Sequence, residues 1–108
     1  MSRYYIFIMK LENEKYFIGK TTKSDFKVEN LHILYKSLSD LSDFIVLNKP
    51  IKVIEFIPNC TEQDVDKYTL KYMKRYGMRN VRGGSYALHY LTNETKDKIK
   101  HLIETKNL

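Results

Sequence analysis

The apolar and polar positions in the first part of the chain form two dense apolar runs with a short polar break between them. Residues 4–11 and 15–21 are rich in aromatic and branched side chains, and Glu12, Asn13 and Glu14 separate them. This arrangement predicts a β-hairpin. A later run, residues 51–57, alternates between apolar and polar positions and predicts a third strand that ends before Pro58.

One long helix is predicted after the third strand. Thr61, with Asp64 three residues later, resembles a capping box, and the apolar residues that follow recur at helical spacing. Gly77 is well placed to end this helix, and residues 79–86 are predicted to form a glycine-containing loop. Further helices are expected from Asp25 onward, over residues 40–47, and from Thr92 or Asn93 to the end of the chain.

The composition fits one small globular domain. The chain has 108 residues, 43% of them hydrophobic, with only two prolines and four glycines. The longest apolar run, residues 4–9, is too short to cross a membrane, and Cys60 is the only cysteine, so no intrachain disulfide can form. We therefore expect a protein of a reducing intracellular compartment, the cytoplasm or nucleus, that is neither secreted nor inserted into a membrane.

The excess positive charge is concentrated in one segment. The formal net charge is +6, and no acidic residue occurs between Lys67 and Asn93. Such a segment is typical of a surface that binds a polyanion, because cationic side chains that neutralise phosphates release their counterions. A solvated helix face explains the same charges without any partner. The basic residues of the segment are Lys67, Lys71, Lys74, Arg75, Arg79 and Arg82.

A glycine motif lies within this basic segment. Gly83 and Gly84 would let backbone N–H groups approach an anion, and the guanidinium of Arg82 can donate two hydrogen bonds to a phosphate. The alternative is a loop whose glycines are needed only for packing. The candidate phosphate-binding residues are therefore Lys71, Lys74, Arg75, Arg79, Arg82, Gly83 and Gly84.

Three stretches, taken in order, resemble a known family. Residues 5–7 (YIF) are followed, ten residues after Phe7, by residues 17–21 (FIGKT), and residues 80–86 (NVRGGSY) come later. This order resembles the GIY-YIG endonuclease domain. Residues 49–55 and 66–86 look like a subgroup of these domains that is often found in large DNA viruses, and the resemblance covers roughly residues 4–88.

The resemblance implies an α+β fold with a small three-stranded antiparallel sheet, over about residues 4–11, 15–21 and 51–57, flanked by helices. It implies a domain over residues 1–90 and leaves the rest of the chain unexplained. For residues 91–108 we expect a C-terminal helix that packs on the domain or joins two copies in a homodimer. Members of the family cut one strand of a nucleic acid with a single divalent metal ion, here expected to be Mg²⁺ or Mn²⁺. They use two tyrosines, an arginine, a carboxylate and an asparagine.

Only two of these five family residues are matched. Both tyrosine positions fall on phenylalanines, Phe7 and Phe17, whose rings can neither take up nor relay a proton. The arginine position falls on Lys27, which keeps the charge but loses the bidentate fork. Asp66 matches the metal-binding carboxylate, and Asn80 matches the supporting asparagine.

Two other interpretations of these positions stay open. Tyr5 and Tyr16 are eleven residues apart and would restore both hydroxyls, but Tyr16 precedes Gly19 by three residues where the motif has two. Such a one-residue shift turns a strand side chain to the other face of a sheet. Alternatively, Phe7 and Phe17 are plain core residues, and the charge of Asp66 serves only the positive end of a helix.

The sequence therefore predicts a nucleic-acid-binding protein, with DNA as the expected partner of its basic face, that carries a degenerate GIY-YIG cleavage site. The alternative is an active metal-dependent endonuclease. In that case Asp66 would bind the metal, and Tyr5, Tyr16 or a metal-bound hydroxide would act as the base. A protein-interaction module built on the same scaffold is the third possibility.

Overall fold

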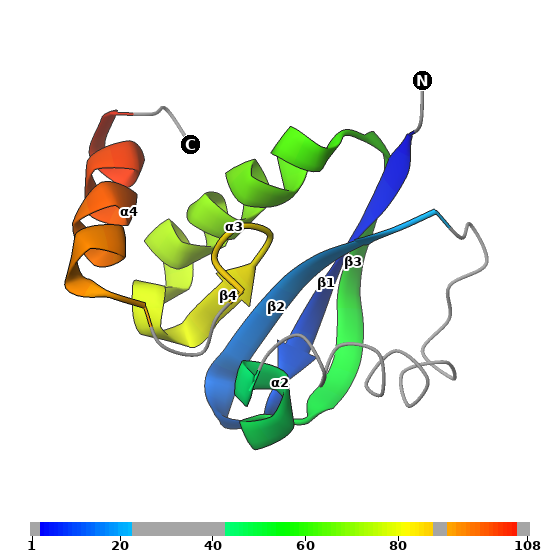
Figure 1. Cartoon of the computed structure of the whole chain (residues 1–108). Helices are drawn as coiled ribbons and strands as arrows, with labels where there is room; N and C mark the ends of the chain where they lie inside the picture. The colour runs from blue at the N-terminus through cyan, green and yellow to red at the C-terminus, as the bar shows by residue number, and fades with distance from the viewer. Residues whose placement is uncertain (1–2, 23–42, 88–90, 106–108) are drawn as a thin grey trace.

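A four-stranded mixed sheet with helices on both faces forms the centre of the protein. The computed structural model describes residues 3–22, 43–87 and 91–105. The strand order is β3-β1-β2-β4, and the fold is α+β. Figure 1 shows α3 lying across one face of the sheet, with α4 beside it. The strands are β1 (Tyr4–Leu11), β2 (Lys15–Thr21), β3 (Pro50–Cys60) and β4 (Val81–Gly83), and the helices are α2 (Asp43–Leu47), α3 (Glu62–Tyr76) and α4 (Asn93–Thr105).

The predicted β-hairpin is confirmed with its expected boundaries. β1 and β2 pair antiparallel in a single register from Tyr5 opposite Thr21 to Leu11 opposite Lys15. A short 3-10 turn, Glu12–Glu14, joins them, and Asn13 adopts a positive φ of 62° that asparagine tolerates better than most residues. In this register Phe7 lies opposite Gly19, and a Cβ added at Gly19 would lie 2.3 Å from Cζ of Phe7. The phenyl ring therefore occupies the space that a side chain at position 19 would need.

The third strand is also confirmed, but it is longer than predicted. β3 pairs antiparallel with β1 and runs past Pro58 to Cys60. Because β3 is the outer strand of the sheet, a proline that cannot donate a hydrogen bond is tolerated there. The register shifts three times along this pairing, between Tyr4 and Ile6, between Ile8 and Met9, and between Lys10 and Leu11. Such irregularities are common on edge strands, where they disturb pairing with other chains.

The expectation of three antiparallel strands is wrong in one respect, because the sheet has a fourth strand. Val81–Gly83, predicted as loop, form β4 and pair parallel to β2, with Tyr16 opposite Val81 and Ile18 opposite Gly83. Three residues are too few to show a strand periodicity in the sequence. The strand forms because Gly83 has no side chain: a Cβ there would lie 2.4 Å from the carbonyl oxygen of Ile18.

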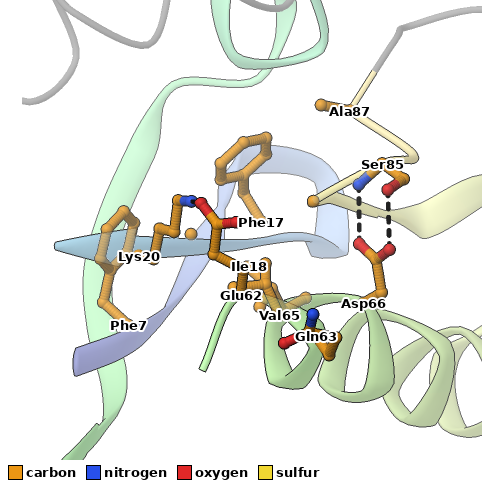
Figure 2. A pocket seen from close by; sticks show the side chains of 12 residues that line it. Phe7, Phe17, Ile18, Lys20, Glu62, Gln63, Val65, Asp66, Ser85 and Ala87 are labelled. Atoms are coloured by element: carbon orange, nitrogen blue, oxygen red, sulfur yellow. Dashed lines mark hydrogen bonds and ion pairs between the residues drawn. The ribbon is translucent and has the colours of Figure 1, made fainter. Parts of the chain in front are cut away.

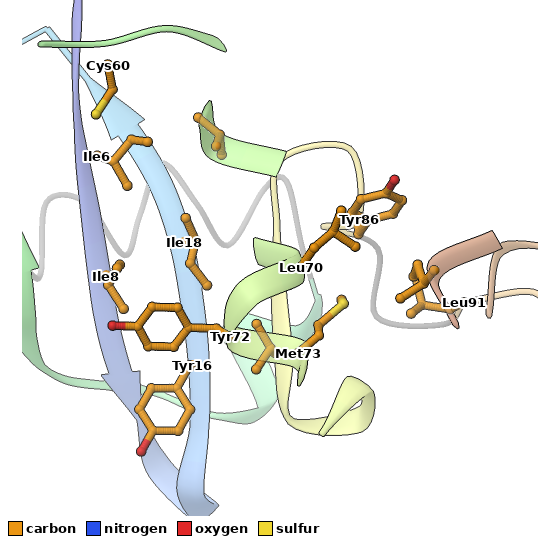
Figure 3. Packing of buried hydrophobic residues seen from close by; sticks show 13 residues of the cluster. Ile6, Ile8, Tyr16, Ile18, Cys60, Leu70, Tyr72, Met73, Tyr86 and Leu91 are labelled. Carbon is orange, nitrogen blue, oxygen red and sulfur yellow. The ribbon is translucent and has the colours of Figure 1, made fainter. Parts of the chain in front are cut away.

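The side chains of the sheet divide into two apolar clusters, one on each face. Ile6, Ile8 and Ile18 point toward α3 and pack with Leu70 and Met73 of that helix, as Figure 3 shows. The alternate residues of the hairpin point to the other face, where they pack with Phe44 and Ile45 of α2. This second cluster consists of Phe7, Met9, Leu11, Phe17, Phe44 and Ile45. Alternation along β1 and β2 therefore serves two cores, which is why both strands are almost wholly apolar.

The helices that the sequence predicts after the third strand are both present. The Asp64 carboxylate accepts the N–H of Thr61 at 2.8 Å, and α3 ends where Gly77 adopts a φ of 98°. The buried Ile99 of α4 belongs to the cluster on the α3 face, so α4 packs on the domain within this chain. The helix expected from Asp25 lies outside the described residues. Within the part of the chain that the structure describes, no helix is long and apolar enough to cross a membrane.

We expect Gly83→Ala to lower the free energy of unfolding by about 1–3 kcal/mol, because the new methyl group would meet backbone that cannot move independently. Its Cβ would also lie 2.7 Å from the hydroxyl of the buried Thr69. Urea unfolding followed by circular dichroism measures the change. Lys98→Ala, on the exposed surface of α4, is the control and should change stability by less than about 0.5 kcal/mol. Equal stability of the Gly83 variant and the wild type would show that β4 is not held closely to β2.

Candidate functional site

A cleft of about 550 Å³ opens where β4 ends and β2 continues. β4 pairs with β2 only as far as Ile18, so Gly19 and Lys20 extend beyond it. The first turns of α3 and residues 84–87 form the other walls. Figure 2 shows this arrangement from close by. The described lining residues are Phe7, Phe17, Ile18, Gly19, Lys20, Glu62, Gln63, Val65, Asp66, Gly84, Ser85 and Ala87.

An ion pair closes one side of the cleft. The ammonium group of Lys20 binds the carboxylate of Glu62, at the start of α3. The same ammonium lies 4.6 Å from the centre of the Tyr4 ring. The hydrogen bond from Lys20, together with its charge, holds the pKa of Glu62 below its usual value. The charge of Lys20 is therefore already neutralised within the cleft.

A second polar pair closes the other side. The carboxylate of Asp66 accepts the backbone N–H of Ser85 on one oxygen and the Ser85 hydroxyl on the other, both at 2.7 Å. Gly84 adopts a φ of 50°, and a Cβ there would lie 2.0 Å from an oxygen of Asp66. Burial and, to a smaller extent, the negative charge of Asp66 raise the pKa of the nearby Tyr86. Asp66 therefore anchors the turn after β4 to α3 while remaining a source of negative charge.

Four of the residues singled out in the sequence meet in this cleft. Phe7, Phe17, Asp66 and Gly84 come from β1, β2, α3 and the turn after β4, and all four line it. Phe7 and Phe17 lie on one face of the hairpin. Phe17 pairs with Met9, two residues after Phe7, and side chains two residues apart along a strand point to the same face. Lys27 lies outside the described residues.

Asn80 is not part of the cleft as described, because it lies past the opposite end of α3. Its amide group donates to the carbonyl of Tyr76 at 2.7 Å, and its oxygen accepts from the ammonium of Lys15 at 2.6 Å. These contacts fasten the end of the helix to the hairpin. The structure therefore gives Asn80 a packing role and does not bring it to Asp66.

Tyr5 and Tyr16 are not brought together either. Tyr5 lies opposite Thr21 and Tyr16 lies opposite Lys10, so the two rings are on opposite faces of the hairpin and toward opposite ends. Tyr16 is 7% exposed and stacks on Tyr76 with ring centres 4.3 Å apart. Burial and the neighbouring Tyr76 raise its pKa, so the phenol is harder to deprotonate than an exposed tyrosine. Neither tyrosine is among the described residues that line the cleft.

The donor set of the cleft does not fit a divalent metal ion held by the protein. Among residues 3–22, 43–87 and 91–105, no three side chains of the metal-ligating types His, Cys, Asp and Glu gather at one point. Both oxygens of Asp66 accept hydrogen bonds from Ser85, and Glu62 is bound to Lys20. Magnesium prefers several oxygen ligands in a near-octahedral arrangement. The described lining supplies only two carboxylates, Asp66 and Glu62, and Glu62 is already bound to Lys20.

The candidate phosphate-binding residues separate into an exposed group and a buried group. Lys71, Lys74, Arg75 and Arg79 are exposed. Arg82 is only 6% exposed, and its guanidinium donates to the carbonyls of Met78 and Val81 at 2.6 and 2.7 Å. It also lies 5.0 Å from the centre of the Phe44 ring, and burial lowers its pKa.

The glycine motif therefore serves packing, which was the alternative interpretation of its sequence. Arg82 points into the cluster on the α2 face, Gly83 allows β4 to approach β2, and Gly84 makes room for the Asp66 carboxylate. These positions do not favour direct contact between Arg82 and a phosphate on the surface.

The sequence analysis gave no individual role to four polar residues of the cleft: Lys20, Glu62, Gln63 and Ser85. Lys20 and Ser85 do lie within stretches that carry the family resemblance, residues 17–21 and 80–86. Lys20 shares a face with Ile18, two residues earlier, and could have been placed near α3 by alternation. Gln63 and Glu62 fall in the first turn of a helix, where polar residues are expected in any case, so they gave no separate signal.

No family model matches the chain, and no curated protein or solved structure shows significant similarity to it. The resemblance to the GIY-YIG domain therefore depends on the motif residues alone.

We expect Asp66→Ala to lower the free energy of unfolding by about 1–2 kcal/mol, because the N–H and hydroxyl of Ser85 lose a charged acceptor. Asp66→Asn should lose less, since the amide oxygen can still accept one of the two hydrogen bonds. Urea unfolding measures both changes, with Asp97→Ala on the exposed face of α4 as the matched control. A fully stable Asp66→Ala variant would mean that Asp66 does not hold the turn after β4.

Proposed function

We propose that this protein binds nucleic acid, with DNA as the expected partner, through the exposed basic face of α3. We further propose that its scaffold is a divergent GIY-YIG domain whose cleavage site is degenerate. The single observation that carries the proposal is the separation of charge along α3. Every ionisable acid of the helix lies in its first five residues, and every base follows.

The three acids of α3 are all engaged by the fold. Glu62 binds Lys20, Asp64 binds the N–H of Thr61, and Asp66 binds Ser85. The cations that follow are not neutralised by these acids, because Lys67, Lys71, Lys74 and Arg75 are exposed on the side away from the sheet. Favourable interaction with the helix dipole explains part of this order, since cations stabilise a helix C-terminus. It does not require a row of four cations along the exposed face.

Three of the cations form one continuous ridge. Lys67, Lys71 and Arg75 are spaced four residues apart, so they follow one another along the surface of the helix at intervals of about 6 Å. Gln63, which lies one helical turn before the first cation of the ridge, lines the cleft. A phosphate backbone that follows the ridge would therefore lead directly to the mouth of the cleft.

Loss of cleavage follows from the side chains at the family positions. Phe7 and Phe17 are 1% and 4% exposed and have no hydroxyl, so they cannot activate a water molecule. Asp66 has no free carboxylate beside it in the described lining, because Glu62 is bound to Lys20, and Asn80 binds Lys15 at the other end of α3. These observations favour a scaffold that keeps contact with nucleic acid and has lost the reaction.

We expect the double variant Lys67→Ala/Lys71→Ala to bind DNA about tenfold or more weakly at low salt and to reduce the slope of log affinity against log salt by about 2, one for each lost phosphate contact. Fluorescence anisotropy with labelled DNA over a salt series measures both quantities.

Lys98→Ala/Lys100→Ala is the matched control. It removes two exposed lysines from α4, a helix that also carries Glu94, Asp97 and Glu104. We expect little change in affinity or slope. Equal losses in the two double variants would indicate non-specific attraction by net charge, and absence of salt-sensitive binding in the wild type would overturn the proposal.

We expect no metal-dependent nicking of supercoiled plasmid DNA by the wild type above the level of Asp66→Ala, with either Mg²⁺ or Mn²⁺. Gel electrophoresis of the plasmid forms measures this, with a chelator control. The alternative of an active endonuclease has one observation in its favour, since Phe7, Phe17 and Asp66 line the same cleft. Metal-dependent nicking that Asp66→Ala abolishes would establish that alternative and refute the degenerate site.

A further inference from the structure

The cleft beside the basic ridge carries a surplus negative charge, whereas the ridge is positive. This difference indicates which part of a nucleic acid each of them can bind. We propose that the cleft takes one unstacked nucleobase, while the phosphates stay outside on the ridge of Lys67, Lys71 and Arg75. The bases that suit it best carry an exocyclic amino group. This inference rests on the proposed function and names the part of the nucleic acid that enters the cleft.

The charge of the cleft disfavours a phosphate. The described lining residues include one cation, Lys20, and two carboxylates, Glu62 and Asp66. Because Lys20 is bound to Glu62, the charge of Asp66 is left without a cationic partner in the lining. A phosphodiester in the cleft would face this negative charge at close range, whereas a neutral base would not.

The walls suit the faces of a base. The apolar lining residues are Phe17, Ile18, Val65 and Ala87, of which Ala87 is the most exposed, and the cleft volume of about 550 Å³ lies in the range of small-molecule sites. Proteins that bind an extruded base hold its flat faces between aromatic or apolar side chains. Gly19, which also lines the cleft, has no side chain, and the ring of Phe7 occupies the space that a side chain there would need.

The polar groups of the cleft suit the edge of an amino-bearing base. Each oxygen of Asp66 accepts one hydrogen bond from Ser85 and keeps a second lone pair, so the carboxylate can accept from an additional donor. Gln63 is exposed on the same wall and offers both an acceptor and a donor. Cytosine presents an amino group where thymine presents a carbonyl oxygen, so cytosine should bind more tightly.

The position of Gln63 connects the cleft to the ridge. It lies one helical turn before Lys67, so the cleft opens at the first end of the cationic row. A strand whose phosphates follow the row can therefore place a base at that end in the cleft without moving its phosphates past Asp66.

Single-stranded oligomers of equal length and equal charge test the inference. We compare oligo-dC, oligo-dT and an abasic sugar-phosphate chain by fluorescence anisotropy over a salt series. The salt slopes should agree, because the phosphates are the same. Oligo-dC should bind about tenfold more tightly than the abasic chain, as expected for one stacked base, and oligo-dT should lie between them.

Two variants locate the base in the cleft. Ala87→Leu narrows the cleft without changing the ridge and should bring oligo-dC to the affinity of the abasic chain. Gln63→Ala should reduce the difference between oligo-dC and oligo-dT. Asn93→Ala, which removes an exposed amide from the first turn of α4, should leave that difference unchanged. Thermal unfolding checks that each variant is folded.

The outcomes distinguish this inference from the proposed function. Salt-sensitive binding that is equally tight for the abasic chain would refute the base site and leave the proposed function intact. A preference for oligo-dC that survives both Ala87→Leu and Gln63→Ala would place the base elsewhere and also refute it. Absence of salt-sensitive binding to every oligomer would refute both proposals.

Discussion

The close contact between β2 and β4 determines where every other part of the candidate site lies. The backbone of Gly83 approaches the carbonyl of Ile18 so closely that no side chain fits between them. This contact fixes the chain that follows α3 against the edge of the hairpin. Because the pairing stops at Gly83 while β2 continues to Thr21, it also leaves the space that becomes the cleft. A longer β4 would fill that space with backbone.

The same short segment separates the charges of the molecule. Arg82 is drawn into the core beside Phe44, and the carboxylate of Asp66 is directed at the turn formed by Gly84 and Ser85. The remaining cations of the segment stay on the outer surface of α3 and at Arg79. A cleft with a surplus carboxylate therefore lies beside a basic helix face. We propose on this ground that the helix attracts phosphates and that the cleft takes a neutral base.

Phe7 and Phe17, which the family resemblance places at tyrosine positions, have a clear structural role. Phe7 covers Gly19, and both rings belong to the cluster that includes Phe44 and Ile45 of α2. Buried phenyl rings contribute more to packing than phenol rings that need a hydrogen-bond partner. Phe7 and Phe17 therefore line the cleft and at the same time belong to the hydrophobic cluster beneath it. Such buried rings are suited to packing and unsuited to proton transfer.

The elements that could be predicted from the sequence are those whose signal is local. Tyr4–Leu11 and Lys15–Thr21 are dense in strand-forming residues, and the spacing of apolar residues after Thr61 sets α3, with Gly77 at its end. The concentration of cations from Lys67 onward is also evident in the sequence. Their exposure on α3 could be predicted as well, because the apolar residues of the helix occupy the side that faces the core. Phe7, Phe17 and Asp66 were placed in one site by resemblance, and the structure brings them to one cleft.

The direction in which the remaining groups face depends on contacts between distant parts of the chain. β4 exists because Val81–Gly83 meet a strand about 65 residues earlier, and no local pattern contains that partner. Burial of Arg82 depends on the position of Phe44, and the engagement of Asp66 depends on the turn at Ser85. Asn80 binds Lys15 because the hairpin happens to end beside the C-terminus of α3. The type of a residue determines which interactions its side chain can make. The partners of that side chain come from distant parts of the chain, and they decide whether it can still bind a ligand.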